Sequence, residues 1–179
     1  MSLEIIMGPM FSGKSSELIR RVNRLTTIGK PYVVYSSLND NRYGIEGVYT
    51  HDMNSIHCVS VQTLRETIQT QEFQDSEYIF IDEAQFFKDL YNYVIDIVDI
   101  HKKRVIVIGL NGDSKRVPFG QINDLVPHCD KLQLLHALCS RCKDGTPGIF
   151  SLRTTENSNQ ICVGSVDIYQ AVCRKCFLQ

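Results

Sequence analysis

The chain has 179 residues, 43% of them hydrophobic and 22% charged, and its formal net charge at pH 7 is −1. This size suits one domain with at most a small appendage, and the near-neutral charge argues against a basic face for coating DNA or a membrane. No apolar stretch approaches the length of a membrane span and the N-terminus lacks a secretory signal pattern, so we expect neither a membrane nor a nucleic-acid partner.

The first motif follows a short apolar run, residues 3–7, and matches the pattern G-x-x-x-x-G-K-[ST] in full. Its two glycines allow backbone N–H groups to turn inward around an anion, and its lysine adds a positive charge. The final serine hydroxyl can ligate Mg²⁺, and the following helix presents its positive N-terminal end. A glycine turn before an ordinary helix is the alternative. The pattern predicts a nucleoside triphosphate site at Gly8, Pro9, Met10, Phe11, Ser12, Gly13, Lys14 and Ser15.

Beyond this loop the hydrophobic pattern alternates between helices and short strands. Leu18, Val22 and Leu25 recur at helical spacing, and Gly29 and Pro31 end that helix. The polar segment 36–55 has no clear period, and a loop of that length in a compact domain is usually functional or disordered. Further strands are predicted at 32–35, 56–61, 78–81, 105–108 and 131–135, and further helices at 63–71 and along the face formed by Leu90, Val94, Ile97, Val98 and His101.

The central strands are continuous apolar runs rather than alternating ones, and amphipathic helices separate them. This arrangement is typical of a parallel sheet covered on both faces, so we expect an α/β fold. From Ala137 onward, cysteine, glycine, proline and short strand-like pieces replace this pattern. We therefore predict a nucleotide-binding domain over residues 1–136 and a small second domain over residues 137–179.

Two adjacent acids, Asp82 and Glu83, end the apolar strand at 78–81. In proteins with a phosphate-binding loop, an aspartate at the end of a neighbouring strand helps to hold Mg²⁺, and Asp82 fits that position. Glu83 is placed to polarise the nucleophile that attacks the γ-phosphate, either water or a substrate hydroxyl. The alternative is that the two acids only begin a helix, since acids favour first turns.

Four of the seven cysteines form two C-x-x-C pairs, Cys139 with Cys142 and Cys173 with Cys176. Four sulfurs at this spacing predict a closed structural zinc site. Two redox pairs, or four unrelated thiols, are the alternatives. The remaining cysteines are expected to be small buried residues or inert thiols. Because an ATP-type loop accompanies these thiols, we expect a reducing, nucleotide-rich compartment such as the cytoplasm.

Taken in order, these segments resemble the zinc-containing thymidine kinases of cells and large DNA viruses. The resemblance runs from Ile6 to Phe177 and includes, besides the loop and both cysteine pairs, the segments 40–43, 50–52, 82–87, 109–112, 118–120 and 163–173. It implies a P-loop, RecA-like parallel sheet flanked by helices and a C-terminal zinc-binding domain whose loop closes over the substrate. It also implies transfer of the γ-phosphate of ATP to the 5′-hydroxyl of thymidine, and we expect of deoxyuridine. Relatives are usually homotetramers or homodimers.

The resemblance assigns roles at the phosphate-transfer centre. Glu83 would be the base that draws the proton from the hydroxyl, and Arg42 would neutralise charge at the transferred phosphoryl group. Ser15 and Asp82 would attend Mg²⁺. The nucleotide site would also be lined by Asp40, Asn41, Arg42, Asp82, Glu83, Ala84 and Gln85.

The resemblance also implies a base-binding site, formed by apolar walls and by a loop that reads the base through main-chain groups. The walls would be Met10, Phe86, Leu110 and Phe119, and the loop would be Gln160, Ile161, Cys162, Val163 and Gly164, with Tyr169 beyond it. Two positions depart from the usual pattern. Asn111 stands where aspartate is common, and Ser114 stands where an aromatic residue is common, which removes an apolar contact with the base.

Two other functions share the same loop and sheet. One is a RecA-like ATPase acting on single-stranded nucleic acid, but the neutral charge and the lack of basic runs interleaved with aromatics count against it. The other is a nucleotide sensor without turnover, against which the glutamate beside the metal aspartate argues. Product identification after ATP consumption with thymidine, with single-stranded DNA or with neither separates all three.

Overall fold

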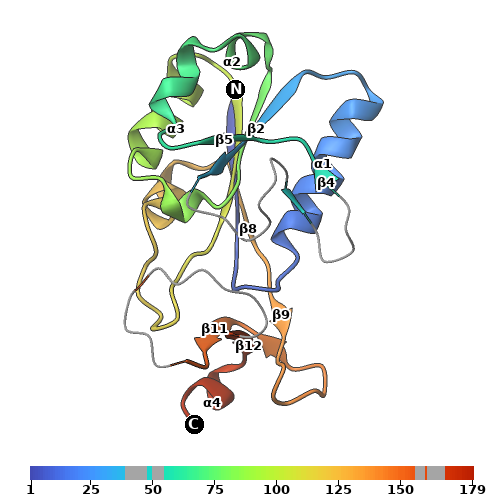
Figure 1. Cartoon of the computed structure of the whole chain (residues 1–179), viewed down its shortest axis with the longest axis vertical. Coiled ribbons are helices and arrows are strands. Elements are labelled where there is room, and N and C mark those ends of the chain that lie inside the picture. Colours follow the sequence, from blue (N-terminus) through green and yellow to red (C-terminus); the bar gives the residue numbers. More distant parts are fainter. Residues whose placement is uncertain (39–47, 50–54, 156–159, 161–167) are drawn as a thin grey trace.

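The structure is a computed structural model that describes residues 1–38, 48–49, 55–155, 160 and 168–179. Its centre is a six-stranded sheet in the order β5-β2-β6-β7-β1-β8, in which every pairing is parallel. Helices cover both faces of this sheet, α1 on one side and α2 and α3 on the other (Figure 1). The prediction of a helix-flanked parallel sheet is therefore confirmed. The strands are β1 Ser2–Met7, β2 Tyr32–Ser37, β5 Val59–Val61, β6 Tyr78–Ile81, β7 Arg104–Gly109 and β8 Lys131–Leu134.

The continuous apolar runs of the strands arise because both faces of the sheet are buried. Alternate residues of one strand enter different cores: Ile5 packs against the α3 side and Ile6 against the α1 side, and both are fully buried. The helical elements are α1 Lys14–Thr27, α2 Gln71–Asp75, α3 Leu90–Asp99, and the 3₁₀ helices η1 Arg65–Gln69, η2 Ala84–Phe86 and η3 Ile122–His128.

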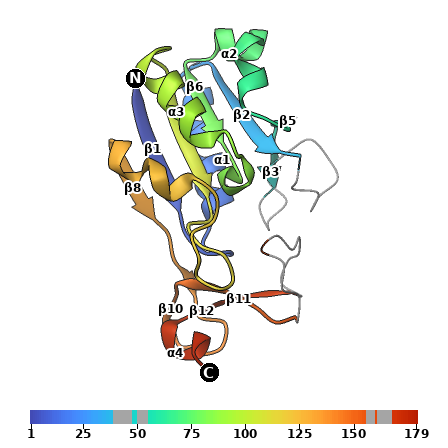
Figure 2. The ribbon, with the colours of Figure 1, turned by 90° about the vertical axis from the view of Figure 1, so that its left-hand side faces the viewer.

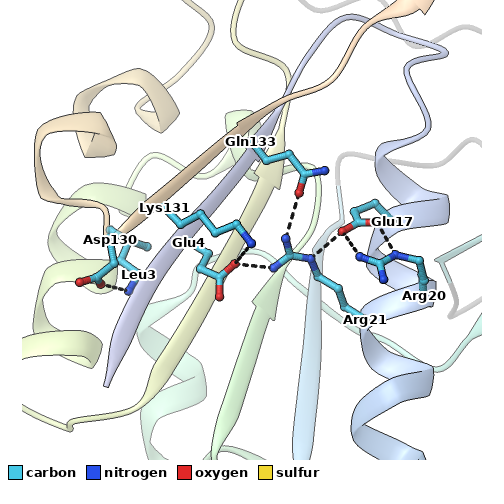
Figure 3. Close-up of polar contacts among 8 residues, drawn as sticks. All are labelled: Leu3, Glu4, Glu17, Arg20, Arg21, Asp130, Lys131 and Gln133. Atoms are coloured by element: carbon cyan, nitrogen blue, oxygen red, sulfur yellow. Dashed lines mark hydrogen bonds and ion pairs between the residues drawn. The ribbon is translucent and has the colours of Figure 1, made fainter.

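A network of charged side chains ties α1 to the sheet (Figure 3). The Arg21 guanidinium donates to Glu4 of β1 at 2.6 Å, to Glu17 one turn earlier in α1 at 2.9 Å, and to Gln133 of β8 at 3.0 Å. Arg20 adds a second pair to Glu17 at 2.6 Å. Because α1 begins directly after the glycine loop, this network also fixes the helix end that faces the loop.

Several predicted element bounds were wrong. The helix predicted at 63–71 is two pieces, η1 and α2, because Thr70 adopts extended backbone between them and its hydroxyl caps α2 by accepting from Phe73 N–H. The helix face predicted to reach His101 ends with α3 at Asp99, and His101 is exposed.

The strand predicted at 56–61 is also two pieces, because β5 joins the main sheet whereas β4 Ser55–Ile56 pairs antiparallel with β3 Val48–Tyr49. That pair lies partly inside the segment 36–55 predicted as loop, and β2 extends into it as far as Ser37. The final parallel strand ends at Leu134, one residue earlier than predicted.

After residue 136 the elements are short and lie below the carboxyl ends of the main strands (Figures 1 and 2). They are β9 Ala137–Leu138 paired with β10 Pro147–Gly148, β11 Phe150–Arg153 paired with β12 Tyr169–Val172, and α4 Arg174–Phe177. The division into domains 1–136 and 137–179 stays a prediction. Within the described ranges, no helix combines the length and apolar character that a membrane crossing requires.

Candidate active site

The glycine loop connects β1 to α1 at the carboxyl edge of the sheet, where parallel α/β folds bind their ligands. Gly13 is the residue before α1 and has the left-handed φ of 82°, which glycine adopts without steric cost. Gly8 meets a different constraint, because a Cβ built there would lie 2.3 Å from the carbonyl oxygen of Leu135. Lack of space therefore excludes a side chain at Gly8, whereas the backbone conformation favours glycine at Gly13.

The polar groups of the loop fit an anion acceptor. Lys14 Nζ donates to the carbonyl oxygen of Pro9 at 2.7 Å, which places the ammonium group across the loop. The Ser12 hydroxyl oxygen is buried and has no hydrogen-bond partner among the described residues. A buried polar atom normally has a partner, and a phosphate oxygen would supply one. The N-terminal amides of α1 add further donors aimed along the helix axis.

The acidic pair follows β6, at the same edge of the sheet as the loop. Asp82 is 6% exposed and its N–H donates to the carbonyl oxygen of Tyr35 at 2.8 Å, which fixes its backbone to the end of β2. Glu83 has a left-handed φ of 47°. A non-glycine residue rarely adopts this conformation, and such residues cluster at functional sites.

One side chain links Glu83 to the neighbouring strand. Gln85 is 4% exposed, and its Nε2 donates to Glu83 Oε2 at 2.5 Å while its Oε1 accepts from the Leu110 N–H at 2.9 Å. A Cβ at Gly109 would lie 2.6 Å from Gln85 Oε1, so β7 must end in glycine for this contact to form. The carboxylate of Glu83 is thus held by an amide that is itself held by β7.

The predicted apolar wall is only partly assembled by contacts in the structure. The rings of Phe86 and Phe119 meet edge to face with centroids 5.6 Å apart. Phe119 is buried, and Met10, Phe86 and Leu110 are half-buried. Ser114 is half-buried in the turn before Phe119. The loop that carries these last residues also holds Asn111, whose carbonyl accepts from Asn123 Nδ2 at 2.7 Å.

The ends of β11 and β12 provide the base of the predicted substrate loop. Tyr169 is buried, and its hydroxyl accepts from Arg153 Nη2 at 2.9 Å while the guanidinium lies over its ring. Arg153 Nη2 also donates to the carbonyl oxygen of Gln160 at 3.1 Å. Gln160 Nε2 donates to Asp113 Oδ2 at 2.9 Å, which joins this base to the loop after β7.

Other predicted site residues lie outside the described part of the chain. These are Asp40, Asn41 and Arg42 of the nucleotide site and Ile161, Cys162, Val163 and Gly164 of the base-reading loop.

The two C-x-x-C pairs converge into one cluster. The four sulfur atoms lie within 4.8 Å of one another, and Cys142 Sγ is 3.5 Å from Cys176 Sγ and 3.7 Å from Cys173 Sγ. Tetrahedral zinc with Zn–S bonds of about 2.3 Å separates its sulfurs by about 3.8 Å, so this donor set fits the metal. Backbone N–H groups, that of Cys142 foremost, lower the pKa of Cys139 to about 6, whereas the neighbouring thiols, that of Cys176 foremost, raise the pKa of Cys142. The cluster can hold a metal such as zinc.

Sequence reasoning missed Ser151 and Asp113. The Met10 N–H in the glycine loop donates to Ser151 Oγ at 2.9 Å, and Ser151 is 5% exposed. This hydrogen bond joins residues 141 positions apart, so no local sequence pattern predicts it. Asp113 carries a signal of a weaker kind, because aspartate in a glycine- and proline-containing turn commonly accepts from backbone N–H groups nearby.

Comparison with known proteins gives a consistent result. A family model described as thymidine kinase matches residues 1–177. The chain is 37% identical over 180 residues to a thymidine kinase of Oryza sativa subsp. japonica, which covers 98% of this chain and 66% of that protein. It is 38% identical over 179 residues to the thymidine kinase of fowlpox virus (strain NVSL), covering 98% of this chain and 96% of that one. The vaccinia virus (strain Western Reserve) thymidine kinase is 38% identical over 177 residues, with the same coverage.

Proposed function

The chain belongs to the thymidine kinase family, and from that premise we propose that it transfers the γ-phosphate of ATP to the 5′-hydroxyl of thymidine. The family makes the protein a kinase, which uses ATP and takes a nucleoside as substrate. The products are thymidine monophosphate and ADP. The observation that carries the proposal is the pairing of a complete phosphate loop after β1 with a positioned carboxylate after β6.

In this reaction Glu83 accepts the proton of the 5′-hydroxyl while that oxygen attacks the γ-phosphorus. The bond from the γ-phosphorus to the bridging oxygen of ADP breaks, and the negative charge passes to ADP. The rate acceleration comes from positioning of the reactants and from electrostatic stabilisation, since phosphoryl transfer requires little covalent chemistry from the protein. Gln85 supports this role because it fixes the Glu83 carboxylate by a 2.5 Å hydrogen bond.

We further propose that the nucleotide phosphates lie in the loop Gly8–Ser15, with Lys14 released from the Pro9 carbonyl to contact them. Asp82 and Ser15 would hold Mg²⁺, an ion that neutralises charge on the phosphate oxygens. Asp82 suits this task because it is buried at the strand end. Arg42 and the segment Asp40–Asn41 remain part of the proposal through the family resemblance.

The nucleoside base would lie against Phe86, Leu110, Phe119 and Met10 and would be read by the segment Gln160–Gly164, with Tyr169 further along the chain. The edge-to-face contact of Phe86 with Phe119 supports an aromatic wall, since stacked and edge contacts with a flat base contribute binding free energy. Ser114 leaves this wall without the aromatic contact common in relatives. Acceptance of deoxyuridine, which lacks one methyl group, is part of the proposal.

Zinc at Cys139, Cys142, Cys173 and Cys176 would be structural, because four thiolates leave no open coordination position. It would tie β9, β12 and α4 together beneath the site. We also propose a homotetramer or homodimer working in the cytoplasm, where ATP and reduced thiols occur together.

The test is an assay of purified protein with ATP and Mg²⁺ in three parallel reactions, with thymidine, with single-stranded DNA and with neither. We expect ADP and thymidine monophosphate to form in equal amounts only with thymidine. ATP consumption stimulated by single-stranded DNA, or a failure to phosphorylate any pyrimidine deoxynucleoside, contradicts the proposal.

A further inference from the structure

The turn Asp113–Val117, in the loop between β7 and η3, is closed by its own aspartate. Asp113 Oδ1 accepts from the N–H groups of Lys115 at 2.8 Å and Val117 at 2.9 Å. The Asp113 N–H donates to the Val117 carbonyl at 2.9 Å, and the Arg116 N–H donates to the Asp113 carbonyl at 3.0 Å. Asp113 is only 9% exposed. The turn is therefore a rigid unit rather than an open loop.

Arg116 at the end of this turn has a left-handed φ of 64°. A residue with a Cβ pays free energy for this conformation and keeps it only where the surroundings fix it. Arg116 is exposed, and the hydrogen bonds of the turn, among them its own N–H to the Asp113 carbonyl at 3.0 Å, fix its backbone. Its guanidinium group makes further contacts outside the turn.

The guanidinium of Arg116 lies over two aromatic rings of the C-terminal segment. Its central carbon is 4.6 Å from the ring centroid of Phe177 and 5.5 Å from that of Phe150, both within the range of a cation–π contact. These rings are 5.2 Å apart and pack on the cluster that contains Cys139, Cys173 and Cys176. Arg116 thus attaches the turn to the cysteine cluster.

A second attachment comes from the other oxygen of the closing carboxylate. Asp113 Oδ2 accepts from Gln160 Nε2 at 2.9 Å, and the Gln160 carbonyl accepts from Arg153 of β11. The turn is held on two sides by residues far along the chain. The loop after β7 reaches down to this region in both ribbon views (Figures 1 and 2).

The same turn continues directly into the proposed base wall. Phe119 follows after Pro118, and Gly120 packs so closely that a Cβ there would lie 2.3 Å from the Gln85 carbonyl oxygen. The Phe119 ring meets Phe86. A shift of the turn would therefore move Phe119 against Phe86 and Gly120 against Gln85.

Resting on the function proposed above, we propose that Arg116 is a positioning residue for nucleoside binding. Its contact with Phe150 and Phe177 holds the rigid Asp113–Val117 turn in place against the C-terminal segment, and the position of the turn fixes that of Phe119 in the base wall. Arg116 touches neither reacting atom, so its loss should raise the KM for thymidine and leave kcat nearly unchanged.

The test compares Arg116→Gly and Arg116→Lys with the control Arg174→Ala. Glycine adopts the left-handed backbone without strain, so Arg116→Gly removes the side-chain contact and keeps the turn foldable. Arg174 lies over the same Phe150 ring at 5.0 Å but comes from α4 and not from the turn. We expect Arg116→Gly to raise the KM for thymidine roughly 3- to 30-fold, Arg116→Lys to give a smaller rise, and Arg174→Ala to leave it unchanged. Equal KM values for Arg116→Gly and wild type overturn the proposal.

Amide hydrogen exchange of the same variants tests whether Arg116 holds the Asp113–Val117 turn in place, and this test does not depend on enzyme activity. We expect Arg116→Gly to speed exchange in residues 110–121, whereas Arg174→Ala should not. Unchanged exchange in that segment also overturns the proposal. If the wild-type protein proves inactive toward thymidine, the proposed function fails, yet the exchange result still shows whether Arg116 holds the turn.

Discussion

The amide of Gln85 connects two strand ends, because it donates to Glu83 Oε2 at 2.5 Å and accepts from the Leu110 N–H at 2.9 Å. Glu83 follows β6 and Leu110 follows β7. The Gln85 amide therefore fixes the position of the Glu83 carboxylate relative to the sheet. A hydrogen bond from an amide to a carboxylate is stronger than one between two neutral groups, and it fixes the orientation of the carboxylate.

Gln85→Leu should lower kcat by about 10- to 100-fold, because the Glu83 carboxylate loses its donor and a misplaced catalytic group costs about that much. The Leu110 N–H also loses its acceptor, so a lower melting temperature is expected. Steady-state kinetics and thermal unfolding measure both. Gln121→Leu is the matched control, since Gln121 Oε1 likewise accepts from a backbone N–H, that of Tyr91 at the start of α3. A Gln85→Leu enzyme with normal kcat would remove this positioning role.

Glu83→Gln should reduce kcat by roughly 10²- to 10⁴-fold, the usual contribution of a general base. Thymidine binding should survive, because the change removes charge and leaves shape. Turnover and equilibrium binding of thymidine measure the two effects. Glu66→Gln, which retains the Oε1 acceptor for the Gln62 and Thr63 N–H groups, serves as control. If both variants turn over at the wild-type rate, Glu83 is not the base.

Ser151→Ala should raise the KM for ATP a few-fold, because the Met10 N–H in the glycine loop loses its acceptor. A buried hydrogen bond of this kind contributes about 1 kcal/mol, so a comparable loss of stability is expected. Nucleotide titration and denaturant unfolding measure these effects. Ser140→Ala removes a similar hydroxyl, whose partner is the Ala171 carbonyl at 3.1 Å, and should affect stability alone. An identical ATP dependence in the two variants would contradict a link between β11 and the loop.

Protein prepared without chelators should contain about one zinc per chain by elemental analysis, since the four sulfurs fit a single tetrahedral ion. Cys173→Ser should abolish the metal and lower the melting temperature, because metal binding contributes to folding free energy. Cys129→Ser is the control; its thiol donates to the Val126 carbonyl at 3.2 Å, which a hydroxyl can also do. Wild-type protein that contains no metal would count against the site.

Acid should weaken the link between α1 and the sheet. Hydrogen bonds from Arg20, and then from Arg21, lower the pKa of Glu17 from 4.5 to about 2 although partial burial opposes them. A lowered pKa means that the stabilisation is complete above pH 4.5 and is lost as pH falls toward 2. Solvent screening limits the effect to less than about 1 kcal/mol.

Unfolding of wild type and Glu17→Gln at a series of pH values measures this effect. The stability difference between them should be constant from pH 6 to 8 and shrink below about pH 4.5. Glu72→Gln, at an exposed position of α2, is the matched control. A difference independent of pH would assign the effect of Glu17 to something other than its charge.

Short-range patterns were sufficient for the central sheet. The apolar runs at 78–81 and 105–108 predicted strands buried on both faces, and both are found as such in β6 and β7. Bounds failed where a local hydrogen bond outcompeted the pattern, as at Thr70, whose hydroxyl starts a new helix. Strand order, which places β7 between β6 and β1, was not readable from any pattern.

The sequence by itself determined the candidate site residues, namely the glycine loop, the acidic pair and the two cysteine pairs, because each of these patterns spans only a few residues. Only the tertiary structure decided how distant segments hold them. The contacts of Ser151 with Met10, Gln160 with Asp113 and Arg116 with Phe177 each join residues far apart along the chain. Such contacts depend on how the sheet, the loop after β7 and the cysteine cluster pack, and packing is a property of the whole chain rather than of any window of it.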